Sequence, residues 1–188
     1  MIYVIGPKSI KVPNAINTTS RSKNWSRGLS PFFLGPVTLT GANNSISYNV
    51  ENAWQFTKVY PEHTKDGFPS KEYFKWARSG FEDHRAHRYP MGKGRIPCYS
   101  WWNKEKLSYI EARKEIYIPL YSSAVSKSDA FQKLKKIHEE GKDIWLWDFD
   151  GYNHRILDMS WDEVINNEDR KMGHAFVLAM MLEKVIKE

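Results

Sequence analysis

The segment HRYPMGKGRIPCYSWW, at residues 87–102, constrains the fold most, because it can form neither a long helix nor a long strand. Its prolines lack a backbone donor and its glycines favour turns, so we expect a long loop. The same segment carries arginine and lysine side chains together with tyrosine and tryptophan rings. A core strand would not need the charge, and a solvated loop would not need the rings. The combination suits a site that holds a flat, anionic molecule such as a nucleotide.

The overall charge of the chain also favours an anionic partner. The 188 residues have a formal net charge of +6 and a pI of about 9.2. Such a charge attracts nucleotides, nucleic acids and phosphate esters, and a basic surface kept only for solubility has the same charge. The chain also has eight Trp and ten Tyr. Rings at this density usually fill the core, and a surplus often lines a ligand pocket.

Several classes of protein are excluded by what the sequence lacks. Cys98 is the only cysteine, so neither a disulfide framework nor a cysteine metal cluster is possible. The histidines lack the spacing of a helical zinc site, and no Gly-x-Ser-x-Gly motif indicates a serine hydrolase. No apolar run approaches the length of a membrane span, and the opening MIYVIGPKSI is too short for a signal peptide. We expect a cytoplasmic protein with no membrane partner, no metal and no cofactor, whose oligomeric state stays open.

No repeat or linker divides the chain, so we expect a single helix-rich domain of α+β class with a small β-sheet over residues 1–188. Apolar and β-branched residues predict a strand at residues 1–6 and a strand that runs into a turn at 143–154. The segment at residues 31–41 predicts a short strand pair around a Gly-Pro turn. Residues 14–30 are polar and irregular and predict a loop.

Helices are expected where apolar residues recur with helical spacing behind a capping residue. Gly80 is expected to end the second of these helices, and Pro119 is expected to kink or end the third. The predicted helices lie at residues 49–60, 70–80, 106–125 and 128–141, with one or two more after residue 160.

Glu51 is the first candidate for chemistry, because it lies among apolar neighbours in NVENAW at the start of a predicted helix. An acid in this position can simply favour the positive end of the helix dipole. Alternatively, a carboxylate held beside an apolar wall has a raised pKa and can transfer protons. The sequence leaves both interpretations open.

Lys93 is the second candidate, because it lies between Gly92 and Gly94 with Arg88 and Arg95 close by. Glycines allow backbone amides to approach an anion, and neighbouring cations attract phosphate and lower the pKa of a lysine. A lysine of this kind can act as a nucleophile that forms a Schiff base, or it can only clamp a phosphate. A solvated basic turn is the third interpretation.

The remaining candidates are two pairs of residues. Trp101 and Trp102 are adjacent, so in an extended chain only one can face a given pocket, and both suit a core. Asp148 and Asp150 lie on the same side of a strand end. Acids there can be catalytic or can bind metal, and an aspartate can also cap the turn at Gly151.

Several segments, taken in order, resemble the motifs of the NADAR superfamily. They are WSRGLSPFFLGPVTL, VENAWQFTK, MGKGR with the tryptophans that follow it, and IWLWDFDGY, and they span residues 24–152. The family shows an LSNF-x-x-x-PF entry, a helix of the form E-x-x-x-Q-x-x-K, a segment like K-x-x-G-R with a tryptophan, and a late acidic strand end. This chain differs in that Lys93 lies between two glycines and Pro31 follows Ser30. The resemblance implies an α+β N-glycosidase. Some members hydrolyse an N-ribosyl intermediate of riboflavin synthesis, and others remove ADP-ribose from guanine in nucleic acid.

The resemblance also implies roles for residues of this chain. Glu51 corresponds to the glutamate of the helix motif, which Gln55 and Lys58 complete. Lys93 corresponds to the lysine proposed to attack the anomeric carbon of the ribose. Arg95 corresponds to the arginine of the same segment.

The later motifs leave a choice between neighbouring residues. Either Trp101 or Trp102 corresponds to the tryptophan of the family, and one of them would stack on a base. Either Asp148 or Asp150 corresponds to the late acid. That acid would steady the positive charge that builds on the sugar in an oxocarbenium-like transition state.

We therefore expect an N-glycosidase that cleaves the N-ribosyl bond of a nucleotide or of an ADP-ribosyl adduct, including ADP-ribose on a nucleic-acid base. The phosphate-bearing group would lie on Arg27, Arg88 and Arg95. Lys93 would trap or stabilise the opened ribose, and Glu51 would transfer protons. Two other functions use the same features. One is a nucleotide or nucleic-acid binder without catalysis, and the other is a transferase that moves a glycosyl or ribosyl group to a DNA base.

Overall fold

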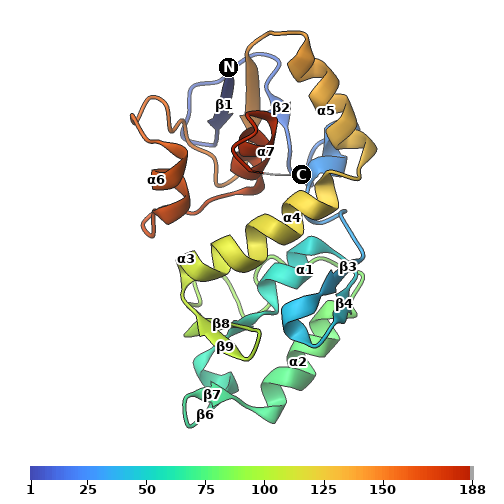
Figure 1. Cartoon of the computed structure of the whole chain (residues 1–188), viewed down its shortest axis with the longest axis vertical. Coiled ribbons are helices and arrows are strands. Elements are labelled where there is room, and N and C mark those ends of the chain that lie inside the picture. Colours follow the sequence, from blue (N-terminus) through green and yellow to red (C-terminus); the bar gives the residue numbers. More distant parts are fainter. Residues whose placement is uncertain (187–188) are drawn as a thin grey trace. The chain divides into compact units, whose positions relative to one another are not determined.

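The computed structural model describes residues 1–186, which form helices and several small sheets (Figure 1). This mixture confirms the expected α+β class. The chain divides into two compact units: the first unit contains Met1–Leu34 and the chain from Tyr121 onward, and the second unit contains Gly35–Leu120. The single domain over residues 1–188 stays a prediction, and no linker in the sequence marks the boundaries of these units. No helix within residues 1–186 is long and apolar enough to cross a membrane.

The first unit contains a parallel sheet with the strand order β1-β10-β2. β1 (Ile2–Ile5) and β10 (Ile144–Trp147) confirm the strands predicted near the two ends of the chain, and they pair along their whole length. β2 (Ile16–Asn17) lies in a segment predicted as loop. That prediction is wrong, because two residues are too few to show an alternating pattern. The parallel pairing places the carboxyl ends of β1 and β10 side by side, and both strands run into turns there.

The helices of the first unit confirm the pattern predicted for the end of the chain. Ser128 and Ser160 cap α5 and α6, and the Ser160 cap is a capping box completed by Glu163. α7 is buried along its whole length and packs against β1 and β10. The elements are the 3-10 helix η1 (Trp25–Leu29), α5 (Asp129–Glu139), α6 (Trp161–Asn166) and α7 (His174–Leu182).

The second unit combines small antiparallel sheets with short helices (Figure 1). The strands pair as β3 with β4, as β5-β8-β9, and as β6 with β7. They are β3 (Val37–Leu39), β4 (Ser45–Ser47), β5 (Lys58–Val59), β6 (Thr64–Lys65), β7 (Phe68–Pro69), β8 (Tyr99–Trp102) and β9 (Glu105–Leu107). The helices are η2 (Thr40–Ala42), α1 (Val50–Gln55), η3 (Pro61–His63), α2 (Lys71–Phe81), α3 (Tyr109–Ala112), the π-helical η4 (Arg113–Tyr117) and α4 (Ile118–Val125), whose last residues belong to the first unit.

The core of the second unit explains why one predicted helix end is wrong. Ser70 caps α2 as expected, but Gly80 lies inside the helix instead of ending it. A Cβ atom at position 80 would lie 2.1 Å from the ring of Phe56, which is buried in the core between α1 and α2. The glycine is therefore needed for close packing and not for a left-handed helix end.

Two further predictions for this unit are wrong. The strand pair expected at residues 31–41 does not form, because β3 pairs with β4 across a turn in which Asn43 and Asn44 have φ values of 54° and 55°. The single long helix expected at residues 106–125 is divided into β9, α3, η4 and α4. Pro119 is the second residue of α4 and neither ends nor begins a helix. Because Pro119 cannot donate a backbone hydrogen bond, the residues before it adopt the wider π-helical turn.

Candidate functional site

Two hydrogen bonds join Glu51, Gln55 and Lys58 in the second unit. Gln55 Nε2 donates to Oε1 of Glu51 over 3.0 Å, and Lys58 Nζ donates to Oε1 of Gln55 over 2.8 Å. Glu51 and Gln55 are buried, and Lys58 is half-buried. The amide of Gln55 therefore orients the carboxylate on one side and holds an ammonium group on the other. The helix predicted at residues 49–60 is too long, because Glu51 and Gln55 lie on α1 whereas Lys58 lies in strand β5.

Two asparagines position α1 and the segment behind it. Asn49 caps the helix as predicted, since its Oδ1 accepts from the backbone N–H of Asn52 over 2.8 Å. The side chain of Asn52 donates to the carbonyl oxygens of Asp83 and Arg85 over 2.9 Å each. It also accepts from the backbone N–H of His87 over 2.8 Å. Sequence analysis missed Asn52, because its partners lie 31 to 35 residues further along the chain.

An aromatic wall lies beside the ammonium group of Lys58. Its Nζ lies 4.7 Å from the centroid of the Trp54 ring, at a distance where a cation is attracted to the ring face. Trp54 packs in turn against Tyr117, with 5.1 Å between the ring centroids. A half-buried ring next to a carboxylate and an ammonium group suits a site for a base or a sugar. Trp54 was not among the predicted site residues.

Arg113 is a second residue that the sequence analysis missed. It is one of the largest fully buried side chains, and it is the first residue of the π-helical turn η4. Its guanidinium group lies 4.6 Å from the centroid of the Tyr109 ring. Arginine is rarely buried without a charged or hydrogen-bonded partner, and π-helical turns are frequent at functional sites.

The basic loop, residues 87–97, is irregular, as the sequence predicts, and is largely exposed. The end of the segment predicted as loop, residues 99–102, instead forms strand β8, because its aromatic residues favour a strand. Gly92 and Gly94 have φ values of 99° and 85°, so a side chain at either position would be strained. Lys93 is exposed, and its ammonium group has no hydrogen-bond or ion-pair partner among residues 1–186. No such interaction therefore joins Lys93 to Glu51. The exposed amine and the glycine backbone are accessible to an anionic group.

The three candidate arginines have different surroundings. Arg95 Nη2 donates to both carboxylate oxygens of Glu62, over 2.7 and 2.8 Å, and this pair is exposed. An exposed pair contributes little to stability, so Arg95 can exchange Glu62 for a phosphate at low cost. The guanidinium group of Arg88 lies 5.4 Å from a neighbouring tyrosine ring. Arg27 belongs to the first unit, where its guanidinium group lies 4.3 Å from the ring of Phe33.

The adjacent tryptophans lie on opposite faces of β8. Trp102 is buried, and Gly41 packs against it so closely that a Cβ atom at position 41 would lie 2.2 Å from the indole ring. Trp101 is half-buried, with its ring 6.5 Å from that of Tyr99. Trp102 is therefore a core residue, and Trp101 is the one whose ring is accessible for stacking.

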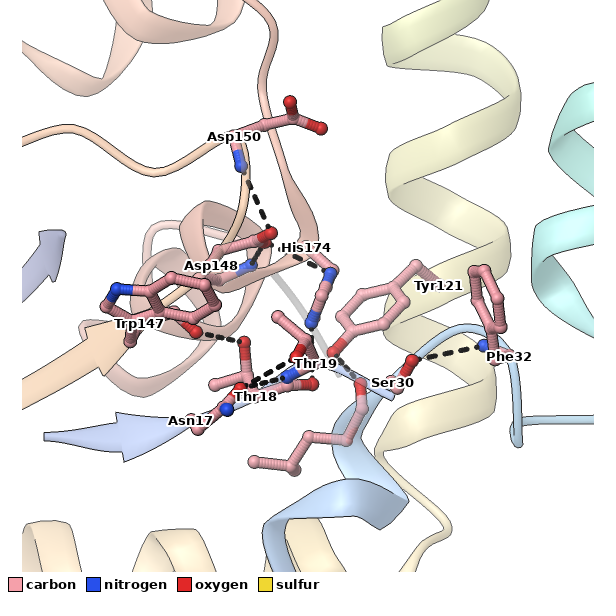
Figure 2. A network of polar contacts seen from close by, with 12 residues as sticks. Asn17, Thr18, Thr19, Ser30, Phe32, Tyr121, Trp147, Asp148, Asp150 and His174 are labelled. Carbon is pink, nitrogen blue, oxygen red and sulfur yellow. Dashed lines mark hydrogen bonds and ion pairs between the residues drawn. The ribbon is translucent and has the colours of Figure 1, made fainter. Parts of the chain in front are cut away.

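Asp148 and Asp150 lie in the turn after β10, in the first unit (Figure 2). Oδ2 of Asp148 accepts from the backbone N–H of Ala175 over 3.1 Å and lies 3.1 Å from Nδ1 of His174. Its Oδ1 accepts from the backbone N–H of Asp150 over 3.3 Å. On the other side of the imidazole, Nε2 of His174 lies 2.8 Å from the carbonyl oxygen of Thr18. Oδ2 of Asp148 therefore holds the start of α7, and its Oδ1 holds the turn after β10.

Asp150, in contrast, lines a cavity of about 480 Å³ in the first unit, where the turns after β1 and β10 meet. Sequence analysis missed this cavity, because its walls come from three separate segments of the chain. Its other charged and aromatic lining residues are Lys8, Phe149, Tyr152, Arg170 and Lys171. Within residues 1–186, no group of three or more His, Cys, Asp or Glu side chains is arranged to hold a metal ion.

Comparison with protein families assigns the chain to one of them. The model of DUF6939, described as a family of unknown function, matches residues 8–178, and the chain belongs to this family. The matched range includes α1, the basic loop and the turn after β10. Comparisons with curated proteins and with solved structures found no match.

Proposed function

We propose that this protein is an N-glycosidase that cleaves the N-ribosyl bond of a nucleotide or of an ADP-ribosyl adduct. The observation that carries the proposal is the hydrogen-bonded line from buried Glu51 through Gln55 to Lys58. Cleavage of an N-ribosyl bond needs a carboxylate of fixed orientation, which faces the positive charge that develops on the sugar. The resemblance of this segment to the E-x-x-x-Q-x-x-K motif of the NADAR superfamily supports the same assignment.

In the proposed reaction, a water molecule adds its oxygen to the anomeric carbon as the carbon–nitrogen bond breaks. The electron pair of that bond moves to the nitrogen of the leaving base, which takes a proton from the ammonium group of Lys58. The carboxylate of Glu51 takes a proton from the attacking water. Gln55 is a positioning residue, because its amide orients the carboxylate and itself transfers no proton. Exchange with solvent then restores both groups.

The cations of the basic loop have a binding role in this proposal. Lys93 and the backbone of Gly92 and Gly94 would hold the phosphate of the substrate, together with Arg88 and Arg95. Support for this role comes from the exposure of Lys93 and from the absence of any hydrogen bond or ion pair between it and Glu51 among residues 1–186. Attack of Lys93 on the anomeric carbon, with a Schiff base to the opened ribose, is the alternative role.

Nucleotide binding without catalysis is a second candidate function. The absence of a hydrogen bond or ion pair between Lys93 and Glu51 among residues 1–186 favours this function, because a binder needs only the cations and the rings. In that case Glu51 only stabilises the start of α1. The two functions differ in whether a base is released from a bound ligand.

Incubation of the protein with candidate substrates tests the proposed function. The panel consists of ADP-ribosylated guanine in nucleic acid, NAD and a ribosylamino-pyrimidine phosphate, and mass spectrometry detects the released base and sugar. We expect release from at least one compound. Borohydride added during turnover, followed by peptide mapping, distinguishes the roles of Lys93, because only a Schiff base leaves a reduced adduct there. Tight binding of the panel with no released base would support the binder instead.

A further inference from the structure

We propose that the cavity of the first unit, defined above by Asp150 and its neighbours, binds a nucleoside 5′-monophosphate. The cavity lies beyond the carboxyl ends of the parallel strands β1 and β10, which is where ligands bind in open parallel sheets. Its volume of about 480 Å³ is within the range of small-molecule sites. This site is built from residues other than those of the proposed reaction, and it stands independently of that proposal.

The charges that line the cavity suit a phosphate ester. Three cations line the cavity: Lys8, which follows β1, and Arg170 and Lys171, which lie just before α7. Asp150 is the one carboxylate in the lining. Three cations against one carboxylate leave two positive charges, which matches a phosphate monoester that is largely dianionic at neutral pH. The carboxylate of Asp148 already accepts the backbone N–H of Ala175 at the start of α7. The phosphate would therefore be held by the lysine and arginine side chains and not by the helix dipole.

The remaining lining suits a nucleoside. The rings of Phe149 and Tyr152 line the cavity, so they can contact a base, and the Arg170 guanidinium lies 4.9 Å from the Tyr152 ring centroid. The carboxylate of Asp150 can accept hydrogen bonds from ribose hydroxyls, as an acid at the end of a strand does in dinucleotide-binding sheets. Phosphate, sugar and base thus each have a matching group in one cavity.

The floor of the cavity is pre-organised by two glycines. A Cβ atom on Gly6 would lie 2.1 Å from the carbonyl oxygen of Gly151, and one on Gly151 would lie 2.1 Å from that of Ile5. The turns after β1 and β10 therefore touch backbone to backbone. Gly6 also accepts from the backbone N–H of Ser9 over 2.9 Å and donates to its hydroxyl over 3.0 Å. A floor held in this way needs little ordering when a ligand binds.

Calorimetric titration of the Glu51→Gln protein with AMP tests this site. The variant is used so that cleavage of AMP adds no heat to the heat of binding. We expect AMP to bind, and the double variant Arg170→Ala/Lys171→Ala to bind it at least tenfold more weakly. Lys142→Ala is the matched control, an exposed lysine of the same unit outside the cavity, and should not change the affinity. Adenosine should bind more weakly than AMP.

Lys93→Ala separates this site from the basic loop. Loss of AMP binding in Lys93→Ala with retention in the Arg170/Lys171 double variant would overturn the proposal, as would no binding of AMP at all. A 5′-phosphorylated trinucleotide provides the same chemistry from nucleic acid. If the protein binds AMP but not the trinucleotide, the ligand is a free nucleotide. If it binds the trinucleotide but not AMP, the proposal is overturned. Failure of the proposed reaction in the substrate panel would leave this result unchanged.

Asp150→Asn provides a second, independent measurement. The intact site should prefer AMP over its 2′,3′-dideoxy analogue by about tenfold, because the analogue has no ribose hydroxyls to donate to the carboxylate of Asp150. Asp150→Asn should reduce this preference to about twofold or less while circular dichroism shows an unchanged fold. An unchanged preference in Asp150→Asn would contradict the role of this carboxylate.

Discussion

Replacement of Glu51 by glutamine is expected to lower the rate of base release by about 10³-fold, with substrate affinity unchanged within about threefold. Loss of a general acid or base costs on the order of 10²–10⁴ in rate. Glutamine has the shape of glutamate and can still accept the hydrogen bond from Gln55 Nε2, which measures 3.0 Å in this structure, so the fold and the binding surface should persist. Only the charge and the proton acceptor are lost. Single-turnover kinetics with saturating protein measures the effect on the chemical step.

The matched control is Glu82→Gln, which makes the same change on an exposed glutamate just after α2. It should leave the rate within twofold. Gln55→Leu removes both hydrogen bonds of the line and should give an intermediate loss, with a shifted pH profile, because the carboxylate is no longer oriented. If Glu51→Gln releases base as fast as Glu82→Gln, Glu51 has no catalytic role and only stabilises the start of α1 through the helix dipole.

The second large effect concerns stability. His154 is buried, with its ring 4.1 Å from that of Trp161, and its Nδ1 atom has no hydrogen-bond partner among residues 1–186. Burial and, to a smaller extent, the nearby charge of Arg155 together lower the pKa of His154 to about 4, against a smaller opposing effect of Glu183. Above pH 6.5 the ring is neutral in both the folded and the unfolded chain, so its full contribution to stability is present there.

As the pH falls below 6.5, the unfolded chain takes up the proton first, and the free energy of unfolding decreases. The loss grows until the folded ring titrates near pH 4 and amounts to about 3 kcal/mol, at 1.36 kcal/mol for each pKa unit. Urea unfolding of the wild type and of His154→Phe at pH 7.5, 6, 5 and 4.5 measures this. We expect a smaller decrease for His154→Phe, because phenylalanine fills the site without titrating. Parallel curves for the two proteins would exclude His154 as the source.

The sequence predicts those parts of the fold that depend on neighbouring residues. Asn49 precedes an apolar helical face, so the start of α1 and the position of Glu51 are predicted correctly. The apolar segments that form β1 and β10 are also recognisable locally. Their pairing is not, because it joins residues from the two ends of the chain. The role of Asn52 cannot be predicted for the same reason, because the hydrogen-bond partners of its side chain lie beyond α2 in the sequence.

The candidate sites differ in the same way. The line from Glu51 to Lys58 lies within eight residues of sequence, so its members could be listed in advance, although strand β5 begins earlier than the helical pattern suggests. The cavity near Asp150 takes Lys8 and Arg170 from segments that only the parallel sheet brings together. For Asp148 the sequence leaves catalysis, metal binding and capping of the turn open. In the structure its carboxylate accepts from the backbone N–H of Asp150 in that turn and from that of Ala175 in α7, which follows much later in the sequence.

The most direct test of the central claim is the fate of the water oxygen during cleavage. The protein is incubated in ¹⁸O-labelled water with the compound of the panel that it turns over, and mass spectrometry follows the label. Hydrolysis of an N-ribosyl bond predicts one ¹⁸O atom in the released sugar and none in the base, and Glu51→Gln should form the labelled sugar about 10³-fold more slowly than the wild type. An unlabelled sugar joined to another acceptor, or no release of base from any compound, would contradict the claim that this protein is an N-glycosidase.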